Sequence, residues 1–309
     1  EIVFGDWSSD VCSSDLGILI SKIIKPTEAQ SGFDVVYSNL TRIINFNLRK
    51  FPRAKSIGVG VPGVVNLEGV IKVAPNLVGW EDVPLVNLLS KKYSLPVAVD
   101  NDANTAALAE LELGAGISED NFLYVTLGTG VGGTIVADRR IFRGSSGGAG
   151  EIGHIIIDAN RNTSDDSSYR NGILEIFVGK NHITKFAQSF IKDYPKSILH
   201  SYERTDPYFI TEAANLGDEA ALTIYERIGY YLGIGLTSAL NILDIYTVIV
   251  GGGISLAHPL LLKSAMDTIK KRAMPTIANN IKIEQAHFTK DAGIIGAALL
   301  GKKSEFYNY

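Results

Sequence analysis

Four polar residues directly follow a short apolar run, and their types suit acid–base chemistry. The run covers residues 95–99 and reads as a buried strand, and Asp100, Asn101, Asp102 and Asn104 come next. Open α/β sheets bind ligands at the carboxyl ends of such strands. Asp102 could therefore take a proton from a substrate hydroxyl while the Asn side chains hold that substrate. The alternative is that Asp102 or Asn104 only caps the helix that follows.

A second group of polar residues follows a glycine-rich turn. Glu151 and His154 are three residues apart and precede a predicted strand at 155–157. Glu175 opens a predicted helix further along the chain. This set could ligate a metal ion or bind sugar hydroxyls, although a lone histidine often has a purely structural role. Two glycine-rich turns beside the set favour a binding site.

Residues 128–133, GTGVGG, connect two predicted strands, 122–127 and 134–136. This context differs from the Walker and dinucleotide-binding loops, which both lead into a helix. The glycines and Thr129 would nevertheless present backbone N–H groups and a hydroxyl to a phosphate. We interpret the segment as a phosphate-binding hairpin, and a tight structural hairpin is the alternative.

Two further loops follow predicted strands. Strand 246–250 runs into three glycines and Ile254, which favours either a nucleotide site or a tight turn. Strand 56–61 runs into a turn at Gly63, where a glycine would allow close approach to the backbone at a binding site. Packing and turn geometry explain this glycine equally well. Asn76 lies in a loop bounded by Pro75 and Gly79, and an Asn in such a loop is usually a turn residue.

The remaining pattern predicts an α/β protein whose second half is mostly helical. Residues 32–49 show helical spacing of apolar side chains, and 210–216, 218–243 and 260–273 read as buried helices. A segment rich in Gly, Ser and acidic residues at 114–120 is the expected domain boundary.

Composition excludes several classes of protein. The net charge of −4 is mild, and no basic block indicates nucleic-acid binding. No apolar run is long enough to cross a bilayer, and no secretory signal is present. We therefore expect a cytoplasmic protein with no membrane partner.

Residues 1–16 lack strand or helix periodicity and repeat the triplet SSD. They resemble the translation of a common short-read sequencing adapter. We hypothesise that 1–16 is not native and exclude it from fold reasoning. A Ser/Asp-rich arm is the alternative. The segment contains Cys12, the only cysteine, so we expect neither disulfides nor thiolate metal sites.

Taken in order, the segments of 17–300 resemble the ROK family of sugar kinases and sugar-responsive repressors. Their order and spacing carry the resemblance more than any single motif. The matching segments are GVGVPGVV (58–65), APNLVGW (74–80), VDNDAN (99–104), TLGTGVGG (126–133), GGAGEIGH (147–154), GILE (172–175), VGGGIS (250–255) and AGIIGAA (292–298). The resemblance implies the actin-like, ribonuclease-H-like ATPase fold, with two α/β lobes around a cleft. It also implies ATP-dependent phosphorylation of a hexose.

The same resemblance assigns roles to individual residues. Asp102 corresponds to the catalytic base that deprotonates the 6-hydroxyl of the sugar. The sugar-holding positions correspond to Gly63, Asn76, Asn101, Asp102, Glu151, His154 and Glu175. The phosphate and adenosine positions correspond to Gly128, Thr129, Gly130, Gly132, Gly133, Gly252, Gly253 and Ile254. The implied cofactors are ATP and Mg²⁺.

The sequence departs from the family at its zinc motif. Many members carry CxCGxxGCxE, completed by the His of EIGH, but Asp166, Ser168 and Ile173 occupy the three cysteine positions here. Isoleucine cannot ligate a metal, and Asp and Ser replace soft thiolates poorly. We therefore expect no structural zinc, so that His154 serves the sugar directly.

A second departure concerns the start of the chain. Family kinases begin with a strand and a DxGGT hairpin that reaches the ATP phosphates and Mg²⁺, and no such motif precedes Gly17. We expect the N-terminal strand and phosphate hairpin to be missing, an exposed sheet edge, and poor kinase activity. The expected lobes are a small one, 17–115 with the terminal helix 295–309, and a large one, 116–294.

The EIGH segment and the PNLVGW loop resemble those of family glucokinases, so glucose is the expected substrate. Kinases for N-acetylmannosamine, N-acetylglucosamine, fructose or allose stay open. So does the sugar-binding domain of a ROK-type repressor, since a helix-turn-helix would precede this domain. Nucleic acid is an expected partner only in that case. A homodimer is expected, as is common in the family.

Overall fold

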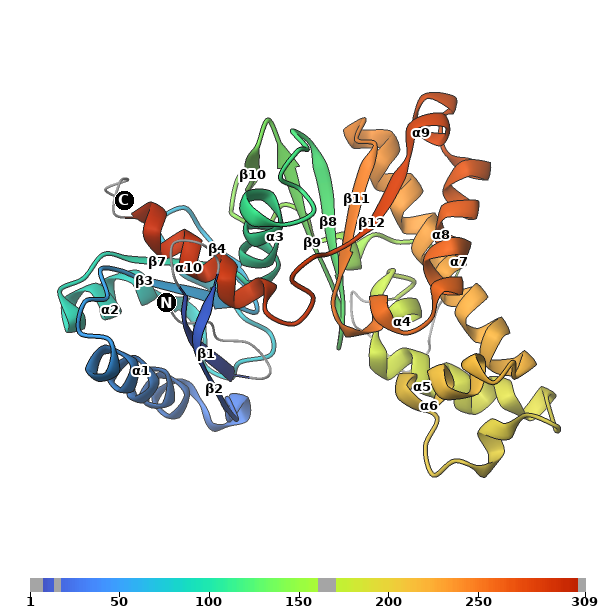
Figure 1. Cartoon of the computed structure of the whole chain (residues 1–309), viewed down its shortest axis with the longest axis horizontal. Coiled ribbons are helices and arrows are strands. Elements are labelled where there is room, and N and C mark those ends of the chain that lie inside the picture. The colour runs from blue at the N-terminus through green and yellow to red at the C-terminus, as the bar shows by residue number, and fades with distance from the viewer. Residues whose placement is uncertain (1–7, 14–17, 161–170, 305–309) are drawn as a thin grey trace. The chain divides into compact units, whose positions relative to one another are not determined.

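The computed structural model describes residues 8–13, 18–160 and 171–304, and the chain divides into two compact units (Figure 1). Unit 1 consists of Glu1–Ser118, Thr134–Ala149 and Lys290–Tyr309. Unit 2 consists of Glu119–Gly133 and Gly150–Thr289. Unit 1 thus includes Thr134–Ala149, which the expected lobes did not assign to it.

Unit 1 contains Asp102 and the elements that position it. Its strands are β1 (Ser8–Ser13), β2 (Leu19–Lys25), β3 (Ile57–Val61), β4 (Val64–Val65), β5 (Ile71–Val73), β6 (Glu81–Val83), β7 (Val97–Asn101), β10 (Arg140–Phe142) and the end of β9 (Val131–Ala137). Its helices are the 3₁₀ turn η1 (Ala29–Ser31), α1 (Phe33–Lys50), α2 (Leu85–Tyr93), α3 (Asp102–Leu113) and α10 (Ala292–Ser304).

Strands β3 and β7 form the parallel pair that ends at the polar residues. Every residue of β3 and the first four residues of β7 are buried, as expected for strands covered on both faces. Their register places Asn101 beside Val61, one residue before the turn at Pro62 and Gly63. The pairing therefore brings this turn and the start of α3 to the same end of the strands.

Glycines allow α10 to approach β3 and α3 at backbone distance. A Cβ on Gly58 would lie 1.7 Å from the carbonyl oxygen of Ala297, and a Cβ on Gly296 would lie 1.5 Å from that of Thr105. No larger side chain fits either position. The small residues of α10 thus allow it to pack closely against the helix that begins at Asp102.

Unit 2 combines a sheet with most of the helices. Its strands are β8 (Phe122–Leu127), β11 (Thr247–Gly251), β12 (Lys282–Gln285) and the start of β9, and the sheet order is β10-β9-β8-β11-β12. Its α-helices are α4 (Glu175–Val178), α5 (Lys180–Phe190), α6 (Pro207–Asn215), α7 (Glu219–Leu243), α8 (Pro259–Arg272) and α9 (Pro275–Asn280). Its 3₁₀ turns are η2 (Ile152–His154), η3 (Ile191–Asp193), η4 (Ile198–Ser201) and η5 (Gly253–Leu256).

Strand β8 pairs with β11 in parallel, and β11 pairs with β12 in parallel. Helix α7 packs closely on α8, because Gly229 and Gly233 leave room for the backbone of Leu261 and Ala265. The buried helices predicted at 210–216, 218–243 and 260–273 are confirmed as α6, α7 and α8.

Two predictions about local structure are wrong. Ser8–Ser13 forms β1, antiparallel to β2, whereas the lack of periodicity in 1–16 predicts no strand there. Its pairing is made by main-chain hydrogen bonds, which do not require alternating side chains. Residues 155–157 do not form a strand; only an isolated bridge joins Ile156 and Ile173 after η2. Residues 1–7 and 14–17 lie outside the described part, and the foreign origin of 1–16 stays a prediction.

Among the described residues, no helix is both long and apolar enough to cross a membrane.

Candidate functional site

The strand-to-helix turn at the end of β7 presents Asn101 and Asp102. The Asn101 side-chain oxygen accepts the backbone N–H groups of Ala103 and Asn104, at 2.8 and 3.2 Å. Asn101 is therefore the N-cap of α3, and the alternative that Asp102 or Asn104 caps the helix is wrong. Asp102 occupies the first helical position, where it is half-buried and accepts the N–H of Ala103 at 2.9 Å.

The amide group of Asn101 also joins this turn to the preceding one. Its Nδ2 donates to the carbonyl oxygen of Gly63 at 3.0 Å. A Cβ on Gly63 would lie 2.3 Å from the carbonyl oxygen of Val73, so only glycine fits there. Gly63 thus lies against the end of β5, which leads into the loop that carries Asn76.

Asn76 lies at the exposed tip of that loop. The N–H of Leu77 donates to the carbonyl of Ala74 at 2.9 Å, which makes Asn76 the third residue of a β-turn. Leu77 and Trp80, which follow Asn76, are buried and anchor the loop to unit 1. The geometry thus fixes the backbone of Asn76 and leaves its side chain at the surface.

Asp100 and Asn104 are buried and bind each other rather than facing solvent. Asn104 Nδ2 donates to Asp100 Oδ1 at 2.9 Å, and Asn104 Oδ1 accepts the hydroxyl of Thr134 at 2.9 Å. Both ends of the Asn104 side chain are thereby engaged, so the expectation that Asn104 holds a substrate is wrong. Asp100 Oδ2 forms an ion pair with Arg143, a residue that the sequence analysis did not select. A carboxylate in a buried strand indicates that a cationic partner is present, but the sequence does not show which residue it is.

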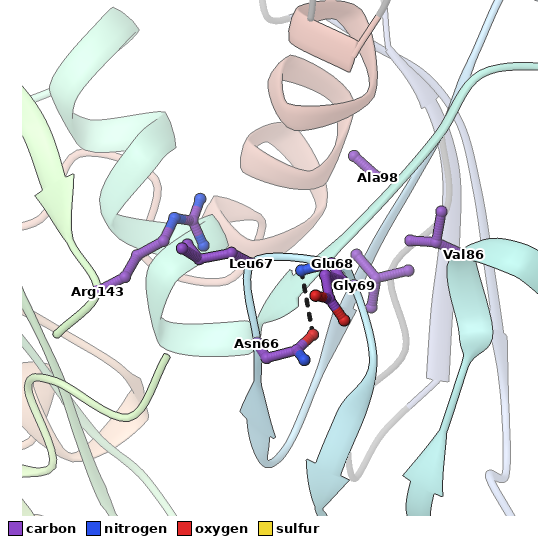
Figure 2. A pocket seen from close by; sticks show the side chains of 8 residues that line it. Asn66, Leu67, Glu68, Gly69, Val86, Ala98 and Arg143 are labelled. Atoms are coloured by element: carbon purple, nitrogen blue, oxygen red, sulfur yellow. Dashed lines mark hydrogen bonds between the residues drawn. The ribbon is translucent and has the colours of Figure 1, made fainter. Parts of the chain in front are cut away.

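A cavity of about 20 Å³ lies beside Arg143, and Figure 2 shows the residues that line it. Half of them belong to the turn from Asn66 to Gly69, where Asn66 Oδ1 accepts the N–H of Glu68 at 3.1 Å. This volume holds about one water molecule and is far too small for a sugar.

In unit 2, residues 128–130 connect β8 to β9, and 131–133 already belong to β9, so the connection is shorter than predicted. The N–H of Gly128 donates to the carbonyl of Gly130 at 3.0 Å, and the N–H of Lys180 donates to the carbonyl of Gly128 at 3.0 Å. A Cβ on Gly128 would meet nothing within 4 Å, so this side of the hairpin is open. Thr129 contributes a hydroxyl at the tip.

The loop after β11 lies against the same hairpin. Gly252 has a φ of +82°, and a Cβ there would lie 2.3 Å from the carbonyl oxygen of Leu127. Gly253 faces open space, whereas Ile254 is buried. Two glycine-rich loops far apart in sequence are therefore neighbours, as a site for an extended phosphate ligand requires.

The hairpin also contacts a carboxylate. Glu175 Oε2 accepts the N–H of Val131 at 3.0 Å, and a Cβ on Gly130 would lie 2.2 Å from the same oxygen. Gly133 and Gly153 in turn let the GAGEIGH segment approach β9, because a Cβ on Gly153 would lie 2.2 Å from the carbonyl of Val131.

Glu151, His154 and Glu175 form one electrostatic cluster. His154 Nε2 lies 4.0 Å from Glu151 Oε2, and both side chains are partly exposed. Burial raises the pKa of Glu151, His154 opposes that rise, and the charge of Glu175 adds to it. The structure thus brings together the three residues that the sequence selected.

Backbone pairing explains how Glu175 reaches the other two. The N–H of Leu174 donates to the carbonyl of Ile155 at 2.8 Å, and the N–H of Ile157 donates to that of Gly172 at 2.8 Å. Gly172 has a φ of +70°, and a Cβ there would collide with Asp158. The GILE segment is therefore fixed beside the EIGH segment.

No group of three or more His, Cys, Asp or Glu residues suited to a metal ion occurs within 8–13, 18–160 and 171–304. Ile173 is buried, with 1% of its surface exposed, and Asp166 and Ser168 lie outside the described residues. The absence of structural zinc stays a prediction.

Residues 11–304 match the sequence profile of the ROK family. The chain is 35% identical to Glucokinase of Halalkalibacterium halodurans, over 94% of the chain and 90% of that protein. It is 31% identical to Xylose repressor of Caldicellulosiruptor bescii, over 82% of the chain and 65% of the repressor. A ROK family glucokinase from Streptomyces griseus, solved in complex with glucose and AMPPNP, superposes with a TM-score of 0.83 at 25% identity, with 98% of both chains covered.

Proposed function

Because this chain belongs to the ROK family, we propose that it transfers the terminal phosphoryl group of ATP to the 6-hydroxyl of a hexose. Its α/β architecture and its structural relatives assign it the actin-like ATPase fold of the sugar kinases. Glucose is the proposed acceptor, supported by the 35% identity to Glucokinase of Halalkalibacterium halodurans.

The placement of Asp102 carries this proposal. The capping of α3 is performed by Asn101, so the carboxylate of Asp102 is not the helix cap. Asp102 lies in the first turn of α3, and the N-terminus of a helix is a favourable place for a carboxylate. A base at this position removes the proton of the hydroxyl as the oxygen attacks phosphorus.

The other selected residues suit a polyol. Asn101 Nδ2 carries a second amide hydrogen besides the one that it donates to Gly63. Asn76 offers an amide at the surface of unit 1. In unit 2, Glu151 and Glu175 offer acceptors and His154 offers a ring nitrogen. We propose that these five side chains hold the sugar hydroxyls.

The two glycine-rich loops of unit 2 fit a nucleotide. Gly128 and Gly253 face open space, so a phosphate could approach the backbone there. Thr129, Gly130, Gly132 and Gly133 complete the proposed phosphate hairpin, and Gly252 and Ile254 the adenosine position. ATP, with Mg²⁺ on its phosphates, would supply the phosphoryl group and the neutralising charge for its transfer.

The repressor similarity supports a second candidate function. Xylose repressor of Caldicellulosiruptor bescii is 31% identical over 264 residues. In that case the same side chains would bind a sugar without turnover. A kinase for N-acetylmannosamine, N-acetylglucosamine, fructose or allose is the third candidate. For the kinase, we also propose a homodimer and a cytoplasmic location, where ATP is available.

The test is sugar-dependent ADP release, measured with glucose and the four other sugars. It uses the chain as given and a form in which residues 1–16 are replaced by a DxGGT segment. Asp102→Asn should lower turnover by about 10² to 10⁴-fold, because it removes the base and preserves the shape. Asp34→Asn, an exposed aspartate in the first turn of α1, is the matched control and should have no effect.

Turnover that persists in Asp102→Asn would contradict the assignment of the base. Sugar binding without turnover in both forms of the chain would favour the repressor function. The sugar with the highest kcat/KM identifies the substrate.

A further inference from the structure

Asp100 is the most buried carboxylate near the proposed base. Only 2% of its side chain is exposed, and it immediately precedes Asn101 and Asp102. Three donors surround it: the backbone N–H of Asn101 at 2.8 Å, the amide of Asn104 at 2.9 Å and the guanidinium of Arg143. A buried charge with a cationic partner and two further donors is well compensated.

This carboxylate joins three segments of unit 1. Asn104 belongs to the first turn of α3, and its Oδ1 accepts a hydrogen bond from the buried hydroxyl of Thr134 on β9. Arg143 follows β10, and its backbone carbonyl accepts the N–H of Ala149 at 3.3 Å, which closes the loop between them. The end of β7, the start of α3 and the β9–β10 segment are therefore fixed to one another.

Solvent has little access to the ion pair. About 24% of the Arg143 side chain is exposed, and the cavity beside it is lined by the Asn66–Gly69 turn, Val86, Ala98 and Val99 (Figure 2). Weak screening by water makes the interaction between Arg143 and Asp100 stronger than that of a surface pair.

From these contacts we infer that Arg143 and Asp100 are positioning residues for Asn101 and Asp102. The Asp100 carboxylate holds the N–H of Asn101 directly, and Arg143 holds the carboxylate. Neither residue is assigned contact with sugar or ATP. The inference rests on the proposed function for the role of Asp102, but the geometry of the turn can be measured independently.

The experiment compares Arg143→Met, Arg143→Lys and Thr134→Val with the unaltered full chain. Hydrogen–deuterium exchange is followed for the peptide covering 100–106 and for β8, and kcat and KM are measured with glucose well below each unfolding midpoint. Thr134→Val keeps the side-chain shape and removes only the hydroxyl bound to Asn104, so it is informative even if Arg143→Met does not fold. Lys303→Met is the control, because it breaks the ion pair with Glu112 on α3.

Arg143→Met should speed exchange in 100–106 by about tenfold and leave β8 unchanged. It should lower kcat by about 10 to 100-fold in fully folded protein, because a misplaced base costs rate without unfolding. Arg143→Lys should restore most of the slow exchange in 100–106 and most of the kcat. Thr134→Val should speed exchange and lower kcat in the same way but by smaller factors.

The inference would be overturned if folded Arg143→Met showed unchanged exchange and unchanged kcat. If Arg143→Met does not fold, the same result in Thr134→Val would overturn it. Equal effects of Lys303→Met would overturn it too, since they would indicate general destabilisation. If neither the unaltered protein nor the form with a DxGGT segment in place of residues 1–16 shows sugar-dependent turnover, the proposed function fails. In that case faster exchange of 100–106 still supports the positioning of the turn, and unchanged exchange overturns it.

Discussion

Asn101 Nδ2 donates a hydrogen bond to the carbonyl oxygen of Gly63 at 3.0 Å while its Oδ1 caps α3. One side chain thus fixes the start of the helix and joins it to the turn after β3. These two roles can be separated by mutation, because a serine or aspartate can cap a helix but cannot reproduce the amide donor.

Asn101→Ala should lower the free energy of unfolding by about 1 kcal/mol for the lost cap and raise the KM for the sugar. Asn101→Asp should retain most of the stability but still raise KM, because it loses the amide donor. Denaturant unfolding and steady-state kinetics measure the two effects. Asp206→Ala, which removes the cap of α6, is the control for stability loss alone. An unchanged KM in Asn101→Asp would contradict the assignment of Asn101 to the sugar.

Glycines in the β8–β9 hairpin should respond differently to a methyl group. Gly130→Ala places a Cβ 2.2 Å from Glu175 Oε2 and displaces this carboxylate from the N–H of Val131, so we expect a loss of about 1 kcal/mol of stability and weaker sugar binding. Gly128→Ala meets nothing within 4 Å and should leave stability almost unchanged while raising the KM for ATP. Thermal unfolding and calorimetric titration with each ligand distinguish the two. Normal ATP affinity in Gly128→Ala would contradict the phosphate assignment.

The raised pKa of Glu151 predicts a specific dependence of stability on pH. The folded protein holds the proton of Glu151 more tightly than the unfolded chain, whose pKa is near 4.5. The stabilising contribution of the protonated form is therefore complete below pH 4.5 and is lost as pH rises through the folded pKa. Relative to Glu151→Gln, which stays neutral, the unaltered protein should lose stability across this window and then reach a plateau.

Neighbouring charges should move that window in opposite directions. His154→Ala removes the lowering influence on the pKa of Glu151, so the loss should occur at higher pH. Glu175→Gln removes a raising influence, so the loss should occur at lower pH. Unfolding midpoints recorded from pH 4 to neutral test both shifts. Parallel curves for Glu151→Gln and the unaltered protein would disprove the electrostatic coupling.

Removal of metal ions should not affect stability. Ile173 occupies the position that corresponds to the third cysteine of the family motif; it is buried and cannot ligate a metal. Metal analysis should find no stoichiometric zinc, and dialysis against a chelator should leave the unfolding temperature unchanged. Zinc at one atom per chain would show that other residues replace the thiolates.

Strong periodicity made several elements predictable. The apolar spacing of 32–49 corresponds to α1, the run 122–127 is β8, and the long apolar stretch 218–243 is α7. Weak patterns failed: the polar Ser8–Ser13 pairs as β1, and 155–157 is held by one bridge rather than a sheet. Main-chain hydrogen bonds decide such segments, and they leave little trace in side-chain pattern.

The candidate site divides in the same way. The sequence by itself selected Asp102, the hairpin 128–133 and the trio Glu151, His154 and Glu175, because residue type, turn chemistry and motif order are local properties. Only the tertiary structure joined Glu175 to Val131 across 44 residues and Arg143 to Asp100 across 43. It also showed that Asn101 caps α3 and that Asn104 is buried. Partners of buried charges depend on which segments packing brings together, and no spacing along the chain encodes that choice.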